Sequence, residues 1–142
     1  MGSLGKNSGL VSGALCVGIG ASIGTLIRAI LEESFPHSPG GWPMATFLIN
    51  LFGSLILGVL LTALAHSGED TGWRRTTRLT TGTGVIGGFT TYSTFILEIH
   101  GLDLPASLAY AALSLTLGIV SSAAGILLAN ALVPVSRTGE TR

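Results

Sequence analysis

The sequence predicts an all-α membrane protein with four transmembrane helices in a single domain, 1–142. Only 10% of its 142 residues are charged, whereas soluble domains usually have about 25%. Four long segments contain no Asp, Glu, Lys or Arg, namely 7–27, 34–68, 79–97 and 104–136. Because a spanning helix needs about 20 apolar residues, we assign one helix to each segment. The predicted spans are 10–31, 43–64, 76–98 and 105–133.

The predicted helices begin at recognisable residues. Trp42 and Pro43 open the second span, since Trp favours the membrane interface and Pro favours a first helical turn. Asp103 is the expected N-cap of the fourth helix, just before Pro105. The first apolar run is too long for the core of a cleaved signal peptide. The loops are short and leave no room for a soluble catalytic domain, so the chain is not predicted to be an enzyme.

Net charge, cysteine and histidine content argue against three further kinds of site. The formal net charge is zero, so nothing indicates binding to nucleic acid. Cys16 is the only cysteine, so no intrachain disulfide can form. His37, His66 and His100 lie near span ends without the spacing of metal ligands, and we interpret them as interfacial.

Small and polar residues inside the first two spans each allow two interpretations. Gly20, Gly24 and Arg28 recur every four residues and share one helix face. The glycines favour close helix packing, whereas Arg28 either reaches the interface or gives a vestibule a positive charge that attracts an anion. Asn50 and Ser54 share a face of the second span. Asn50 either bonds to another helix or lines a polar path.

The third span is the least regular of the four. It has four glycines within seven residues, interleaved with β-branched threonines, and each Gly costs a helix about 1 kcal/mol relative to Ala. We therefore predict a local break within 84–91. Unwound carbonyl oxygens at membrane depth can hold a small cation, but such a break must be buried in protein. This pattern predicts a tightly packed dimer or a larger assembly.

Aromatic and hydroxyl side chains follow the predicted break. Tyr92 and Phe95 share a face, and their ring edges carry partial positive charge that can meet an anion; ordinary core packing is the alternative. Glu98 follows at the expected helix end. In the fourth span, Tyr110 and Ser114 are four residues apart and either join helices or add donors to a polar path.

Three motifs in order resemble the Fluc (CrcB-type) fluoride channels over about 18–118. They are Gly20-Ala21-x-x-Gly24-x-x-x-Arg28, Thr46-Phe47-x-x-Asn50-x-x-Gly53-Ser54 and Gly87-Gly88-x-Thr90-Thr91-Tyr92-Ser93-Thr94-Phe95. The third motif is the most specific. Two positions depart from the family pattern: Tyr92 replaces a usual Phe, and Gly118 replaces a usual hydroxyl residue.

The resemblance implies an antiparallel, dual-topology dimer that encloses two fluoride pores. A structural sodium ion on the dimer axis would be held by the backbone carbonyls of Gly87 and Thr90. The pore positions, carried over from the family motifs and the polar track of the last helix, are Asn50, Thr91, Tyr92, Ser93, Thr94, Phe95, Tyr110 and Ser114, with Arg28 and Glu98 in the vestibule. The implied function is passive export of fluoride across the cell membrane, which relieves fluoride toxicity.

Two other functions compete with the channel. A small four-helix multidrug or cation exporter would need a titratable carboxylate deep in a helix, whereas Asp and Glu lie at predicted span ends or in loops. A structural membrane subunit would not need the polar cluster around Asn50 and Tyr92. Amide, hydroxyl and ring-edge donors without a dense positive charge suit the release of a strongly hydrated small anion.

The arginines predict an orientation that conflicts with dual topology. Arg74, Arg75, Arg78 and Arg137 fall on the side of the two termini, and only Arg28 lies toward the other side. The positive-inside rule then places both termini in the cytoplasm. Either one gene product still inserts both ways and forms a homodimer, which we favour, or the chain pairs with an oppositely oriented paralogue.

Overall fold

The computed structural model describes residues 3–134, and within them the chain is helical and built around one interrupted segment. Three long helices are continuous: α1 (Ser3–Ser34), α2 (Met44–His66) and α6 (Leu104–Leu132). Their parts Gly9–Ser34, Met44–His66 and Leu104–Leu132 are long and apolar enough to cross a membrane. The segment between α2 and α6 contains α3 (Gly72–Thr77), the π-helical segment η1 (Arg78–Ile86), α4 (Gly87–Phe89) and α5 (Ser93–Gly101).

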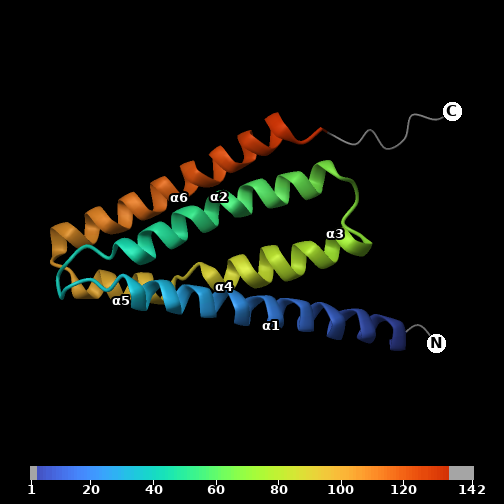
Figure 1. The fold of residues 1–142 in the computed structure, drawn as a ribbon, viewed down its shortest axis with the longest axis horizontal. Coiled ribbons are helices and arrows are strands. Elements are labelled where there is room, and N and C mark those ends of the chain that lie inside the picture. The colour runs from blue at the N-terminus through green and yellow to red at the C-terminus, as the bar shows by residue number, and fades with distance from the viewer. Residues whose placement is uncertain (1–2, 135–142) are drawn as a thin grey trace.

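The helices pack as two pairs. α2 lies against α6, while α1 lies against η1 and α4, as Figure 1 shows. The beginning of α1, the connection from α2 to α3 and the end of α6 all lie at one end of the bundle. Arg74, Arg75 and Arg78 therefore lie toward the end of the bundle where α1 begins and α6 ends, as the sequence predicts. Arg137 lies outside the described residues.

Glycines allow the close approach of α1 and the third span. A Cβ on Gly20 would collide with the Thr80 carbonyl oxygen, and a Cβ on Gly24 would collide with the Val85 carbonyl oxygen. The packing interpretation of the Gly20-x-x-x-Gly24 motif is therefore confirmed. The wide turns of η1 belong to this contact, and π-helical turns are often found at functional sites.

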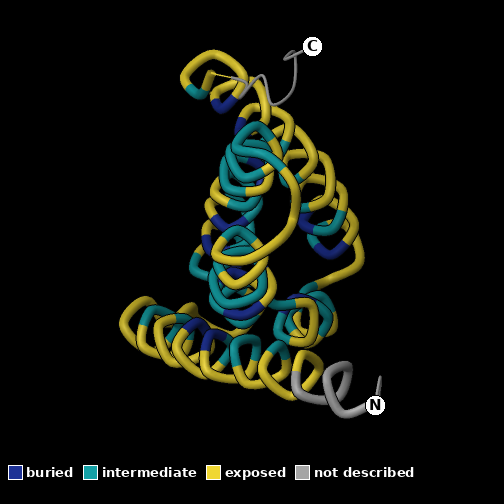
Figure 2. The backbone as a smooth tube through the Cα atoms, turned by 90° about the vertical axis from the view of Figure 1, so that its right-hand side faces the viewer, coloured by how far each residue is buried: buried dark blue, intermediate teal, exposed yellow. Residues whose placement is uncertain are grey.

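Most residues with large apolar side chains are exposed, and exposed positions run along the outside of the long helices in Figure 2. The buried residues are few and include Thr46, Ile49, Phe95 and Tyr110. Exposed leucines and isoleucines on α1, α2 and α6 suit contact with lipid or with another membrane protein. The bundle therefore buries a small polar and aromatic centre inside an apolar surface.

The break in the third span is confirmed, but the glycine-rich run is not unwound. Gly82 and Gly84 lie in η1, Gly87 and Gly88 lie in α4, and the helix continues to Phe89. Thr90 then adopts an extended conformation, with φ −75° and ψ 154°, before α5 starts at Ser93. The physical reason is that Gly84 and Gly88 pack against the backbone of α1 and Gly82 packs against leucines of α2, so the cost of these glycines in a helix is offset by helix contact.

The connection from α5 to α6 is capped as predicted. The Asp103 carboxylate accepts a hydrogen bond from the Ala106 backbone N–H at 2.9 Å. The Ser107 hydroxyl donates to the carbonyl oxygens of Ile99 and Leu102 at the end of α5. Because α5 continues to Gly101, Glu98 lies within the helix rather than at its end.

Candidate functional site

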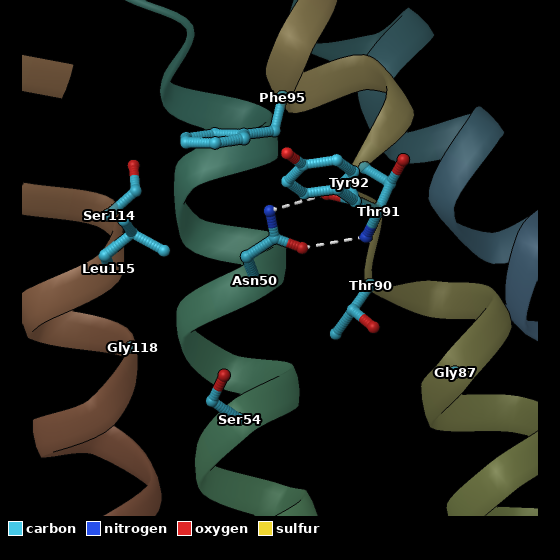
Figure 3. A pocket seen from close by; sticks show the side chains of 10 residues that line it. All are labelled: Asn50, Ser54, Gly87, Thr90, Thr91, Tyr92, Phe95, Ser114, Leu115 and Gly118. Carbon is cyan, nitrogen blue, oxygen red and sulfur yellow. Dashed lines mark hydrogen bonds between the residues drawn. The ribbon is translucent and has the colours of Figure 1, made fainter. Parts of the chain in front are cut away.

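The break between α4 and α5 is held by the side chain of Asn50 on α2. The Thr91 backbone N–H donates to Asn50 Oδ1 at 2.8 Å, and Asn50 Nδ2 donates to the Thr91 carbonyl oxygen at 3.0 Å (Figure 3). The amide thereby satisfies both backbone groups of a residue that has no helical partners, a need that is strict at membrane depth. Asn50 thus bonds to the third span and also lines a pocket beside it. The interpretation as a link between helices and the interpretation as a lining residue of a polar path are therefore compatible.

This arrangement frees two backbone carbonyl oxygens. In a continuous helix, Gly87 would accept from the Thr91 N–H and Thr90 from the Thr94 N–H. The Thr91 N–H donates instead to Asn50, and the Thr94 N–H donates to the Thr91 hydroxyl at 3.2 Å. Gly87 and Thr90, the pair that the resemblance assigns to sodium, thus both lose their helical donors.

A pocket of about 440 Å³ opens beside the break, between α2, α6 and the third span. Figure 3 shows the Asn50 side chain directed at the break, the Phe95 ring nearby, and α6 on the opposite side. The lining contains amide, hydroxyl, backbone and aromatic groups and no charged side chain. The lining residues are Asn50, Ser54, Gly87, Thr90, Thr91, Tyr92, Phe95, Ser114, Leu115 and Gly118.

A chain of hydroxyls connects the break to Arg28 on α1. The Thr91 hydroxyl lies 3.3 Å from that of Ser93 and donates to that of Thr94 at 3.2 Å. Arg28 Nη1 also donates to the Thr94 hydroxyl, at 3.2 Å, and forms an ion pair with Glu32. Because Arg28 Nε donates to the Gly88 carbonyl at 3.4 Å, this side chain turns toward the break rather than only toward the interface.

Phe95 lies at the centre of an aromatic cluster. Its ring centroid is 5.3 Å from that of Tyr110 and 6.0 Å from that of Tyr92, and Trp42 packs edge-on against Tyr110 at 5.3 Å. Tyr110 is fully buried, whereas Tyr92 is 74% exposed. The cluster fixes the Phe95 ring, which is only 6% exposed, at the wall of the pocket.

Glu98 is held by two buried donors. The Thr46 hydroxyl donates to Glu98 Oε1 at 2.5 Å, and the Tyr110 hydroxyl donates to Glu98 Oε2 at 2.7 Å. Glu98 also lines a second pocket of about 270 Å³ with His37 and the turn at Gly40. The carboxylate therefore lies between the aromatic cluster and the end of the bundle that carries the α1–α2 loop.

The structure gathers most, but not all, of the predicted residues in one place. Asn50, Thr91, Tyr92, Phe95 and Ser114 line the pocket with Gly87 and Thr90. The other three pore candidates do not line the pocket but contact residues that do. Ser93 and Thr94 contact the Thr91 hydroxyl, and Tyr110 packs against Phe95. Ser114 Oγ is buried and finds no hydrogen-bond partner within residues 3–134.

Sequence reasoning left three participants out of the predicted site. Ser54 lines the pocket, and its four-residue spacing from Asn50 was the available signal. Thr46 belongs to the second motif, but its bond to Glu98 joins residues 52 apart in sequence. Trp42 was interpreted as an interfacial residue only, and its contact with Tyr110 has no signal in sequence spacing.

Comparison with known proteins places these residues in a family. Residues 15–126 match the family model described as CrcB-like protein, Camphor Resistance (CrcB). A protein of Leifsonia xyli subsp. xyli named fluoride-specific ion channel FluC 2 is 41% identical, with 83% of each chain covered. A protein of Deinococcus radiodurans named fluoride-specific ion channel FluC is 42% identical, over 78% of this chain and 90% of the relative. The chain therefore belongs to the CrcB/FluC family of membrane channel proteins.

Proposed function

We propose that this protein is a fluoride-specific channel, not an enzyme, that lets fluoride leave the cell passively. The observation that carries the proposal is the uncharged, donor-lined pocket at the break, built by a chain that covers most of the length of relatives named fluoride channels. Such a pocket offers Asn50, Ser54, Thr91 and Ser114 as polar groups and Phe95 as a ring edge.

The chemistry of the lining suits fluoride. This anion is small and strongly hydrated, so a pore must replace its water with hydrogen-bond donors and still release it. Ser114 lines the pocket, and its buried Oγ has no hydrogen-bond partner of good geometry within residues 3–134, so we include its hydroxyl among the proposed donors. An arginine or lysine at the same place would hold the anion by full charge and slow its release.

The proposed path runs along the pocket and the hydroxyls behind it. Arg28 serves as the vestibule charge and orders the break through Thr94 and Gly88. Glu98, at the other side of Phe95, orients the Tyr110 and Thr46 hydroxyls. The pore residues proposed are Asn50, Thr91, Tyr92, Ser93, Thr94, Phe95, Tyr110 and Ser114.

A second copy of the chain is proposed to cover the pocket. Lipid cannot satisfy the freed carbonyl oxygens of Gly87 and Thr90, and Tyr92 is 74% exposed beside them. An antiparallel homodimer would bury these groups and explains why the motifs for a complete pore occur in one chain. The alternative is a heterodimer with an oppositely inserted paralogue.

Labelling of single cysteines tests the orientation. Cys16 is first replaced by Ala, because it is the only cysteine, and one cysteine is then placed beyond residue 134. An impermeant thiol reagent should label part of this variant from outside intact cells and the rest only after lysis. Labelling only after lysis, together with no flux from the purified protein, would replace the homodimer with the heterodimer.

A structural sodium ion at the break is part of the proposal. Carbonyl oxygens of unwound helices are suitable sodium ligands, and the freed carbonyls of Gly87 and Thr90 both belong to residues that line the pocket. The ion would neutralise the carbonyl dipoles and tie two copies of the break together.

Fluoride efflux from vesicles tests the function. Purified protein in liposomes should empty a fluoride load without nucleotide and without an imposed proton gradient, while protein-free vesicles retain it. Efflux that requires a proton gradient would support the exporter instead.

A further inference from the structure

A third pocket lies far from the break, where α2 ends and the third span begins. It has a volume of about 240 Å³. Its apolar side comes from α2 and its polar side from the following loop, α3 and η1. The lining residues are Leu61, Leu64, Ala65, Gly68, Asp70, Arg74 and Arg78. None of them lines the pocket at the break, so the two sites are separate.

The two arginines of this pocket differ in their partners. Arg78 Nε donates to both carboxylate oxygens of Asp70 at 3.0 Å, and Arg78 Nη2 donates to Asp70 Oδ2 at 2.6 Å. The charge of Arg78 is therefore balanced by that of Asp70. The hydrogen bonds from Arg78 hold the pKa of Asp70 below its usual range, which keeps the carboxylate charged. Arg74 Nε, in contrast, is buried and has no acceptor within residues 3–134.

A buried guanidinium N–H without an acceptor is costly, so it calls for an acceptor from outside the described chain. The position of the pocket indicates which kind. The membrane-spanning part of α2 ends at His66, and Trp73 is 62% exposed, with the Arg74 guanidinium 5.5 Å from its ring centroid. Exposed Trp beside Arg is typical of the headgroup level of a bilayer.

We propose that this pocket binds the phosphate headgroup of an anionic phospholipid. Arg74 supplies the charge-assisted hydrogen bonds to the phosphate oxygens. Leu61, which is 41% exposed, and Leu64 continue the pocket toward the hydrocarbon and accept the start of an acyl chain. One end of the pocket is thus cationic and the other apolar, which matches the two ends of a lipid.

Tryptophan quenching measures this binding directly. The chain has two tryptophans, so replacement of Trp42 by Phe leaves Trp73 as the only reporter, and a single cooperative thermal transition confirms that this variant is folded. The protein is reconstituted in mixtures of phosphatidylcholine and brominated phosphatidylglycerol. Quenching of Trp73 at each mixing ratio gives the preference for phosphatidylglycerol over phosphatidylcholine.

Three variants separate a site from a general surface charge. Arg74→Gln should lower the preference more than about fivefold, because it removes a surface charge worth about 1 kcal/mol and also the charge-assisted hydrogen bonds to the phosphate. Arg75→Gln removes only the surface charge of an exposed neighbour outside this pocket and should lower the preference no more than about fivefold. Asp70→Asn releases Arg78 and should raise the preference. Fluoride efflux should stay unchanged in all three.

The proposal is overturned if the starting protein shows no preference, or if Arg74→Gln and Arg75→Gln lower it equally. Inorganic phosphate, compared with chloride at matched ionic strength, distinguishes the source of the phosphate group. Little displacement by phosphate supports a lipid site. Complete displacement would mean that the pocket takes free phosphate, which contradicts the lipid assignment.

Discussion

Asn50 and Thr91 exchange two hydrogen bonds, one in each direction, across 41 residues of sequence. The amide takes the place of the helical neighbours that Thr91 lacks, so the backbone can leave the helix for three residues at membrane depth. The same exchange removes the Thr91 N–H from Gly87 and thereby frees a carbonyl. One side chain on α2 therefore links the shape of the break, the pocket and the proposed cation site.

Replacing Asn50 by Leu should abolish most fluoride efflux and lower thermal stability. The change removes a pore donor and leaves the Thr91 N–H and carbonyl without partners, at about 1–3 kcal/mol for each group. Ser54→Ala is the control for stability, because Ser54 lines the same pocket without bonding to the break, and its melting temperature should stay close to that of the unmodified protein. Normal efflux and an unchanged melting temperature for Asn50→Leu would show that Asn50 is neither a pore donor nor a stabilising partner of the Thr91 backbone.

Replacing Gly24 by Ala should destabilise the protein, because the added Cβ would collide with the Val85 carbonyl oxygen and separate α1 from the third span. Overpacking of this kind costs about 1–3 kcal/mol. Gly18→Ala is the control: Gly18 lies in the same helix with nothing within 4 Å of an added Cβ, so this variant should gain up to about 1 kcal/mol. Equal melting temperatures of the two variants would contradict the close packing.

Replacing Phe95 by Leu should slow fluoride efflux while the fold persists. Leu keeps apolar contact with Tyr110 but has no positive ring edge to meet an anion. Tyr92→Phe is the comparison, because it keeps the ring and restores the residue usual at this position in the resemblance, and its efflux should stay close to that of the unmodified protein. If Phe95→Leu conducts fluoride normally, the ring serves packing alone.

Removing sodium should weaken the assembly if the carbonyls of Gly87 and Thr90 hold this ion. Protein purified with a bulky organic cation in place of sodium should melt at a lower temperature, and added sodium chloride should restore it, since a ligand that binds only the folded state stabilises it. The chloride salt of the bulky cation controls for ionic strength. Identical melting curves in all three solutions would exclude a structural sodium site.

The sequence predicts the membrane helices well because their signal is local. Runs without charge give α1, α2 and α6, and the Asp103 cap marks the start of α6. The break was foreseen in the third span, but glycines alone do not specify its position. Asn50, on another helix, determines that the backbone departs at Thr90–Tyr92 instead of at Gly82–Gly88.

Lining residues that belong to a sequence motif could be predicted, whereas contacts between residues of different helices could not. The third motif contains Thr91, Tyr92 and Phe95, which line one pocket with Asn50 in the structure; their role as pore residues stays a prediction. The inward turn of Arg28 toward Gly88, and the bond between Thr46 and Glu98, join residues 60 and 52 apart. Such pairs are fixed by helix packing, which no spacing within a single helix reveals.

The central claim is that this chain passes fluoride and rejects chloride, and parallel efflux from one vesicle preparation tests it most directly. Liposomes with the purified protein are loaded with equal fluoride and chloride, and both ions are followed with selective electrodes after dilution, with a potassium ionophore to carry the balancing charge. The account predicts rapid fluoride efflux with chloride retained at the level of protein-free vesicles. Equal release of both ions, or release of neither, would contradict it.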